Sequence, residues 1–216
     1  MLLRVNPPGT AWHDADLAAA ARACASAAID GIVLPKYERV AQLAAVRVAL
    51  PEGARIVAGL ETALGVADAR TLLAERPDAA YFGAEDYVAD LGGRRTAAGT
   101  EVLYARSAVC LAAHLSGVPA LDQAVVAVHE REAFRADAEQ GRCIGYRGKI
   151  CLHPLQVEIA HTVFAPSPAE VEHARAVLSA AERGVGVVDG RMVDAVHVTM
   201  ARGVLAAAGE GTRGLD

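Results

Sequence analysis

Aromatic residues are scarce in this sequence, although its hydrophobic content is high. Only 4% of its 216 residues are Phe, Trp or Tyr, whereas hydrophobic residues make up 53%, largely as Ala, Val and Leu. Such a chain favours close helix packing over large aromatic pockets. Its length is sufficient for one sizeable hydrophobic core, so we expect a single domain over residues 1–208 and a flexible tail over residues 209–216.

Basic runs, paired cysteines and long apolar segments are missing. The net charge is −5 with no Lys/Arg cluster, which argues against nucleic acid as the main partner. The Ala-rich segment 17–29 is broken by Arg22 and is too short to cross a bilayer. No signal-like segment opens the chain and no Cys-x-x-Cys pair occurs, so we expect a cytoplasmic protein without a membrane partner. We interpret four cysteines as reduced core residues: Cys24, Cys110, Cys143 and Cys151.

Common nucleotide-binding and hydrolase motifs are also missing. The sequence contains no phosphate-binding P-loop, no His-Glu-x-x-His and no serine nucleophile elbow. Gly184-Val185-Gly186 lacks the third glycine of a dinucleotide-binding loop and follows a predicted helix, so we interpret it as part of a turn.

Apolar segments and helical patterns alternate along most of the chain. We predict strands at 2–6, 31–34, 55–60, 79–82, 118–122 and 149–152. We predict helices near 14–28, 38–48, 99–116, 130–140, 154–161, 169–182 and 193–208, with further helical segments before residue 75 and a loop after residue 82. This alternation predicts an α/β fold with a parallel sheet covered by its crossover helices.

Acidic residues follow two neighbouring predicted strands. Glu61 comes directly after strand 55–60, and Asp86 comes shortly after strand 79–82. Enzymes with parallel sheets place their chemistry at the carboxyl ends of strands. Two carboxylates without a neighbouring Cys or His suit a hard cation such as Mg²⁺. A single acidic residue of this kind is as often a helix N-cap or a loop salt bridge, so both interpretations stay open here.

Six short motifs together resemble the citrate lyase beta subunit group of the HpcH/HpaI aldolase family. They are Arg4-Val5-Asn6-Pro7, Gly31-Ile32-Val33-Leu34-Pro35-Lys36, Glu61-Thr62-Ala63, Gly83-Ala84-Glu85-Asp86-Tyr87, Gly148-Lys149-Ile150-Cys151-Leu152-His153-Pro154 and Val188-Asp189-Gly190-Arg191-Met192-Val193-Asp194. The resemblance implies a TIM (β/α) barrel. Family members normally begin with two further strands, so we expect an incomplete barrel with six of eight strands. An open barrel exposes strand edges, which implies lower stability or cover from a partner subunit.

The resemblance also implies a reaction. The expected activity is Mg²⁺-dependent cleavage or formation of a 3-hydroxyacyl-CoA thioester such as citramalyl-, malyl- or citryl-CoA, with an oxo acid and an acyl-CoA as the other partners. Glu61 and Asp86 are the implied ligands of Mg²⁺, with Mn²⁺ as an alternative metal. Asp194 is the implied general acid/base and would reach into a neighbouring subunit of a homo-oligomer, a trimer or hexamer. A residue in the first turn of a helix is the other interpretation of Asp194.

Several basic and acidic residues are candidates for substrate binding. The guanidinium of Arg4 can hold a carboxylate or an enolate oxygen bidentately, or else pair with a nearby acid. Lys36 follows a strand and could meet a CoA phosphate or remain solvated, and Arg94 and Arg95 could contact phosphate or belong to a basic loop. Glu85 could hold metal-bound water or point outward. Asp122 could line the pocket or cap a turn.

Two other functions remain open on the sequence alone. One is a CoA-independent aldolase that releases pyruvate, and the other is an inactive, truncated paralogue with a structural or regulatory role. Segment 189–194 favours a CoA thioester substrate, and the joint presence of Arg4, Glu61, Asp86 and Asp194 argues against decay of the site. Substrate identity, reaction direction and the choice between CoA and a carrier protein do not follow from the residues.

Overall fold

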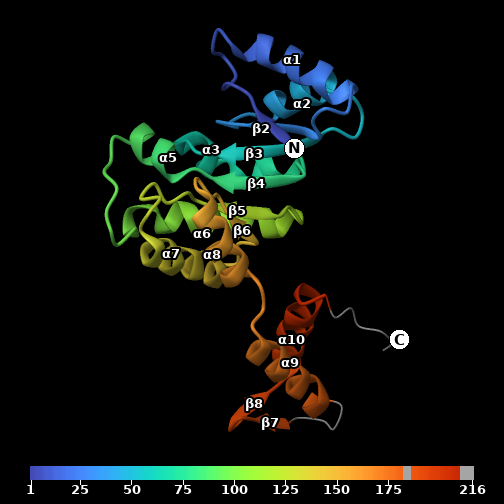
Figure 1. Cartoon of the computed structure of the whole chain (residues 1–216), viewed down its shortest axis with the longest axis vertical. Coiled ribbons are helices and arrows are strands. Elements are labelled where there is room, and N and C mark those ends of the chain that lie inside the picture. The colour runs from blue at the N-terminus through green and yellow to red at the C-terminus, as the bar shows by residue number, and fades with distance from the viewer. Residues whose placement is uncertain (182–185, 210–216) are drawn as a thin grey trace. The chain divides into compact units, whose positions relative to one another are not determined.

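The computed structural model of the chain, which describes residues 1–181 and 186–209, contains a six-stranded parallel sheet (Figure 1). Its strands are β1 (Leu2–Arg4), β2 (Gly31–Leu34), β3 (Arg55–Leu60), β4 (Ala79–Phe82), β5 (Ala120–Asp122) and β6 (Gly148–Lys149). Each strand pairs in parallel with the next one along the chain. This order is that of six consecutive strands of a (β/α) barrel, so the α/β class and the incomplete TIM barrel are confirmed.

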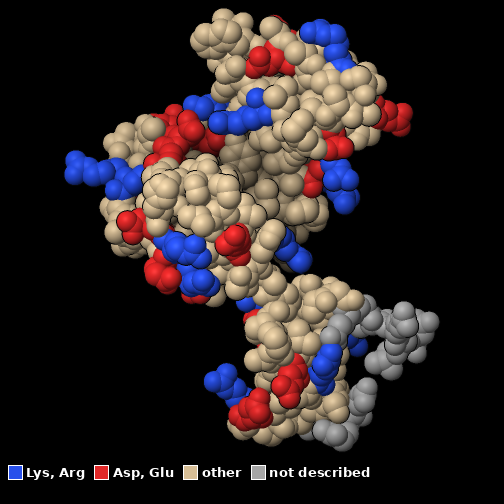
Figure 2. Space-filling view, viewed as in Figure 1, with Lys and Arg blue, Asp and Glu red and all other residues tan. Residues whose placement is uncertain are grey.

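Helices provide the crossovers between these strands. They are α1 (His13–Ala25), α2 (Val40–Ala49), α3 (Ala63–Ala67), α4 (Ala69–Ala74), α5 (Ala84–Asp90), α6 (Thr100–Ser116) and α7 (Arg131–Ile144). Helix α8 (Pro154–Phe164) follows β6. None of the helices in the described residues is long and apolar enough to cross a membrane. On the face drawn in Figure 2, acidic and basic side chains are interspersed over the surface.

Side chains alternate between the two faces of the sheet. Ile32, Leu34 and Phe82 are fully buried on one face. Val33 and Tyr81, which occupy the intervening positions, line a cavity on the other face. Because successive residues of a strand point to opposite faces, the register decides which polar residues can reach that cavity.

The described chain divides into two compact units, the first from Met1 to Ala160 and the second from His161 onward. In the second unit, α9 (Pro168–Ala181) packs against α10 (Ala195–Ala207), around a small core that includes Val177 and Leu205. The expectation of a single domain over residues 1–208 stays a prediction. Residues 210–216 of the expected flexible tail lie outside the described residues.

A β-hairpin in the second unit was not predicted. Strands β7 (Gly186–Val188) and β8 (Arg191–Val193) pair antiparallel through the turn residues Asp189 and Gly190, whose φ angles are 50° and 75°. Two central residues with positive φ are typical of the tight turns that join such strands. From the sequence we interpret Gly184-Val185-Gly186 as part of a turn, but Gly186 is the first residue of β7. The three-residue strands of the hairpin are too short to show a period in the sequence. Gly184 and Val185 lie outside the described residues.

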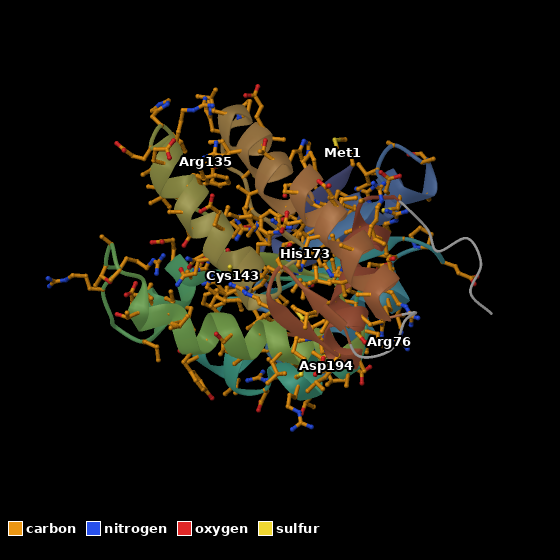
Figure 3. All side chains as sticks on the ribbon, turned by 90° about the horizontal axis from the view of Figure 1, so that it is seen from below. Met1, Arg76, Arg135, Cys143, His173 and Asp194 are labelled. Atoms are coloured by element: carbon orange, nitrogen blue, oxygen red, sulfur yellow. The ribbon has the colours of Figure 1, made fainter. Side chains whose placement is uncertain are left out.

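Three other local predictions were wrong. The loop expected after residue 82 contains helix α5, whose first turn carries Glu85 and Asp86 next to the positive end of the helix dipole. The last predicted strand ends at Lys149, so Cys151 lies beyond it. Cys143 is exposed on α7 (Figure 3), whereas Cys110 is buried as expected.

Candidate functional site

A cavity of about 470 Å³ lies at the carboxyl end of the parallel sheet, in the first unit. We call it the barrel cavity. Its polar lining residues are Arg4, Glu61, Tyr81, Glu85 and Asp86. Its apolar wall includes Val33, Val57, Leu121, Ile150 and Leu152. Four residues that the sequence predicts for the site, from segments up to 82 residues apart, thus line one space.

Glu61 is a buried carboxylate with few positive partners. The residue is 2% exposed and follows the last residue of β3. Its Oε2 accepts a hydrogen bond from the Tyr81 hydroxyl at 2.8 Å, and its Oε1 accepts one from the Lys36 backbone N–H at 3.0 Å. Burial raises the pKa of Glu61 above its ordinary value, and the negative charge of Asp86 raises it further. The hydrogen bond from Tyr81 and the charge of Arg4 act in the opposite direction.

Asp86 lies in the first turn of α5 and pairs with a lysine. Its Oδ1 is 3.0 Å from the Lys36 Nζ, and both side chains are about two-fifths exposed. The hydrogen bond to Asp86 raises the pKa of Lys36. Lys36 therefore contacts both predicted metal ligands, through its ammonium group to Asp86 and through its backbone to Glu61. Its predicted contact with a CoA phosphate stays a prediction.

The backbone of Lys36 has the left-handed conformation, with a φ of 49°. This conformation costs a residue other than glycine about 1–2 kcal/mol. The neighbouring N–H of Tyr37 donates to the Gly59 carbonyl at 2.9 Å, which holds the turn against β3. The strained turn therefore directs one backbone N–H of Lys36 at the Glu61 carboxylate.

Arg4 approaches Glu61 from the last residue of β1. Its Nη2 is 3.9 Å from Glu61 Oε1, and its side chain is 61% exposed. At this distance the guanidinium does not form a bidentate ion pair with Glu61, so most of its N–H donors do not contact that carboxylate. It can therefore bind an anionic group that enters the barrel cavity.

Glu85 and Arg95 are tied to each other. Arg95 Nε donates to Glu85 Oε1 at 2.9 Å, its Nη1 donates to Glu101 at 2.7 Å, and its Nη2 donates to the Gln123 side chain at 3.3 Å. Arg94 is exposed. The substrate-binding roles predicted for Glu85, Arg94 and Arg95 stay predictions, and the structure adds that Arg95 links one wall of the cavity to β5.

Asp194 belongs to the second unit (Figure 3). It is the N-cap of α10, where Oδ1 accepts a hydrogen bond from the Val196 N–H at 3.0 Å and contacts His197 Nδ1 at 2.7 Å. The hydrogen bonds from His197 lower the pKa of Asp194. A lowered pKa makes the carboxylate a weaker base, so this shift does not itself support the role of general acid/base. Asp194 thus caps α10 from the position just before its first turn, close to where the alternative interpretation places it, and its catalytic role stays a prediction.

Asp122 does not line the barrel cavity. It is fully buried at the end of β5, and its neighbour Leu121 is the residue that faces the cavity. The Arg106 guanidinium from α6 donates to both Asp122 oxygens at 2.8 and 2.5 Å, and Lys149 Nζ donates at 3.0 Å. Asp122 is thus part of a buried ion network that also includes Asp137. Both sequence-based interpretations of Asp122 were wrong, because the strand register turns its side chain toward the helices.

The residues of the barrel cavity fit a hard divalent cation. Within the described parts of the chain, no group of three or more His, Cys, Asp or Glu side chains is gathered to hold a metal. Mg²⁺ is commonly bound by one or two carboxylates, with water and substrate oxygens at its other positions. Glu61 and Asp86 provide such a pair, and Gly83 leaves room beside it, since a Cβ there would lie 2.7 Å from Glu61 Oε2. A cation would offset the mutual repulsion of the two carboxylates.

Tyr81 is the lining residue that sequence reasoning missed. The sequence shows it only as part of an apolar strand. Its hydroxyl reaches Glu61 because Tyr81 and Gly59 are paired in the β3–β4 register, and Glu61 lies two residues beyond Gly59 on the same face. A polar contact across strands becomes visible only when the register is known.

Comparisons with known proteins point in one direction. A family model described as HpcH/HpaI aldolase/citrate lyase matches residues 1–154. A citrate lyase subunit beta-like protein from Deinococcus radiodurans is 46% identical over an alignment that covers 95% of this chain and 74% of that protein. A (3S)-malyl-CoA thioesterase from Cereibacter sphaeroides is 38% identical over an alignment that covers 96% of this chain and 73% of that protein.

Solved structures agree with these matches. The crystal structure of the protein CitE from Mycobacterium tuberculosis, in complex with magnesium, acetoacetate and coenzyme A, superposes with a TM-score of 0.83 at 32% identity. The match covers 97% of this chain and 78% of that one.

Proposed function

Because the chain belongs to the HpcH/HpaI aldolase/citrate lyase family, we propose that it is a Mg²⁺-dependent carbon–carbon lyase. Its proposed substrate is a 3-hydroxyacyl-CoA thioester, such as citramalyl-, malyl- or citryl-CoA, which it cleaves to an oxo acid and an acyl-CoA or forms from them. The observation that carries the proposal is the convergence of Glu61, Asp86 and Arg4 on one cavity at the strand ends. The magnesium, acetoacetate and coenzyme A bound by the M. tuberculosis protein support this metal and substrate class.

In this proposal, some residues bind the cation and the anionic oxygens of the substrate, and another transfers a proton. Glu61 and Asp86 hold the cation, and Arg4 binds a carboxylate or enolate oxygen of the oxo acid. Bound Mg²⁺ would supply Lewis-acid stabilisation of the negative charge that develops on oxygen. The apolar wall lowers the local dielectric around the buried Glu61, whereas the interaction of the 61% exposed Arg4 with that charge is screened more by solvent.

Proton transfer is the role proposed for Asp194. A base takes the proton of the substrate's 3-hydroxyl group, the carbon–carbon bond breaks to a carbonyl and a thioester enolate, and the enolate is then protonated on carbon. We propose that Asp194 acts in this way from a neighbouring subunit of a homo-oligomer. A variant forced to be monomeric would then bind the metal and lack turnover, whereas an active monomer would contradict the cross-subunit role.

The test is turnover of a panel of 3-hydroxyacyl-CoA thioesters with Mg²⁺ and with EDTA. We expect activity to be lost in EDTA and to fall by more than about a hundredfold in Asp86→Ala, because a metal ligand is missing. Glu132→Ala is the matched control, since Glu132 is an exposed carboxylate on α7. Turnover that resists EDTA would contradict the proposal. Turnover of the free hydroxy acids without CoA would instead favour the CoA-independent aldolase.

Hydrolysis of the thioester is a second candidate reaction. It is favoured by the name of the C. sphaeroides relative, a (3S)-malyl-CoA thioesterase. The same assay separates the two reactions, because cleavage of the carbon–carbon bond leaves the thioester intact and hydrolysis releases free CoA. Free thiol in the absence of any oxo acid would favour the hydrolase.

A further inference from the structure

At the carboxyl ends of β3 and β4, each large side chain on the cavity face lies opposite a glycine of the neighbouring strand. On β3 and just beyond it, Gly59 is followed two residues later by Glu61, and the corresponding positions of β4 are Tyr81 and Gly83. Gly59 and Tyr81 are partners in the register. Since residues two apart on a strand share a face, all four lie on the cavity face of the sheet.

The two glycines make room for the two large side chains. A Cβ at Gly59 would lie 2.4 Å from both Cζ and the hydroxyl oxygen of Tyr81. A Cβ at Gly83 would lie 2.4 Å from Glu61 Cβ. Both distances are far below van der Waals contact. The ring of Tyr81 therefore lies across Gly59, and its hydroxyl reaches the carboxylate beyond it.

The resulting hydrogen bond fixes one oxygen of Glu61. The Tyr81 hydroxyl donates to Oε2 at 2.8 Å, and the Lys36 N–H donates to Oε1 at 3.0 Å. An ionised carboxylate has about four acceptor positions on its two oxygens, so these bonds leave about two for a cation. The donors come from different segments, and together they prevent rotation of the carboxylate about its terminal torsion.

We propose that Tyr81 is a positioning residue for the metal ligand Glu61, and that Gly59 is required because it admits the phenol ring. The inference rests on the proposed function, since it assigns a role toward the cation that Glu61 and Asp86 hold. Tyr81 donates to the ligand and does not itself bind the cation. Groups that hydrogen-bond to metal ligands commonly change metal affinity by 10- to 100-fold when they are removed.

The test is titration of the metal-free chain with Mn²⁺, followed by the electron paramagnetic resonance signal of the free ion. We expect Tyr81→Phe, which keeps the ring and removes only the hydroxyl, to raise the Kd by about tenfold. Tyr146→Phe is the matched control. Tyr146 is also buried, and its hydroxyl donates to the Arg106 carbonyl at 2.7 Å, in the region of the buried ion network. We expect its Kd to stay within about twofold of the wild type.

Gly59→Ala provides a second, independent variant. The added Cβ would displace the Tyr81 ring, although the Tyr81 hydroxyl is still present. The Kd for Mn²⁺ should therefore rise at least as much as in Tyr81→Phe. Saturating metal should restore most of the kcat of Tyr81→Phe, because the metal-bound site is unchanged in its ligands. A purely structural lesion would not be rescued in this way.

The outcomes separate the two proposals. Wild-type chain that binds no Mn²⁺ would contradict the proposed function and this inference together. Wild-type binding with an unchanged Kd in Tyr81→Phe would overturn the role of Tyr81 alone. An equal loss in Tyr146→Phe would also overturn it, since the effect would then follow from the loss of any buried hydroxyl.

Discussion

Two buried carboxylates, Glu61 and Asp122, stand at the ends of strands of the same sheet and have opposite surroundings. Glu61 is 2% exposed and Asp122 is fully buried. Asp122 receives both arms of the Arg106 guanidinium and the ammonium group of Lys149. Glu61 receives a phenol and a backbone N–H, and its nearest guanidinium is 3.9 Å away.

The difference supports a structural role for Asp122 and agrees with the metal-binding role that we propose for Glu61. A buried charge is tolerated only when it is paired and hydrogen-bonded, and Asp122 meets that condition within the chain. Glu61 is short of positive charge and lies beside a second carboxylate, Asp86, that raises its pKa. A divalent cation between Glu61 and Asp86 would complete the pairing that Arg106 and Lys149 provide for Asp122.

The largest effect is expected on stability when the Asp122 network is broken. Asp122→Asn would leave Arg106 and Lys149 with one buried anion fewer, and we expect the free energy of unfolding to fall by about 3–5 kcal/mol. Urea denaturation followed by circular dichroism measures it, with the exposed Glu132→Gln as control, for which about 0.5 kcal/mol or less is expected. A loss of less than about 1 kcal/mol would contradict the structural role of Asp122.

Glu61→Gln should lower turnover strongly and the free energy of unfolding only slightly. We expect turnover to fall by more than about a hundredfold, which corresponds to about 2.7 kcal/mol in the activation free energy, because the amide is a poor ligand for Mg²⁺. The free energy of unfolding of the metal-free chain should change by no more than about 1 kcal/mol, since no charged partner is left buried and unpaired. Steady-state kinetics and the same urea experiment measure the two quantities. A variant that unfolds as readily as Asp122→Asn would show that the two carboxylates have the same role.

A smaller effect is expected at Arg4. Arg4→Lys keeps the positive charge and loses the planar fork that holds two oxygens, so KM for the thioester should rise by about tenfold with little change in stability. Steady-state kinetics with saturating Mg²⁺ measure KM and kcat separately. An unchanged KM would exclude Arg4 from substrate binding.

The smallest effect is a pH dependence of stability that belongs to Glu61. Its pKa is raised in the folded chain, so between its unfolded and folded values the folded state binds more protons. The contribution of Glu61 to the free energy of unfolding should therefore decrease as the pH rises above about 4.3, with a slope of at most about 1.4 kcal/mol per pH unit. The difference between wild type and Glu61→Gln in EDTA isolates this slope from the other carboxylates. A difference that grows with pH would mean that the pKa of Glu61 is lowered.

The sequence predicted most strands of the sheet and the proximity of Glu61 and Asp86. Runs such as Arg55–Leu60 and Ala79–Phe82 are short, apolar and bounded by loops, so their strands coincide with the predicted ranges. Glu61 and Asp86 could be placed near each other because the carboxyl ends of parallel strands meet at one edge of the sheet.

The remaining features depend on register and on short elements. Whether Asp122 faces the cavity or the helices depends on which alternate residues of β5 point into the cavity, and no local sequence pattern shows this. The Tyr81–Glu61 hydrogen bond likewise requires that Gly59 and Tyr81 be paired. Helix α5 and the β7–β8 hairpin are too short for their periodicity to be read from the sequence.

An anomalous difference map from crystals grown with Mn²⁺ would show whether Glu61 and Asp86 bind one metal ion. We expect one strong peak in the barrel cavity, about 2.1 Å from a carboxylate oxygen of Glu61 and of Asp86, with the Tyr81 hydroxyl still bonded to Glu61. A cavity without a peak, or a peak that contacts neither carboxylate, would contradict the proposed metal site.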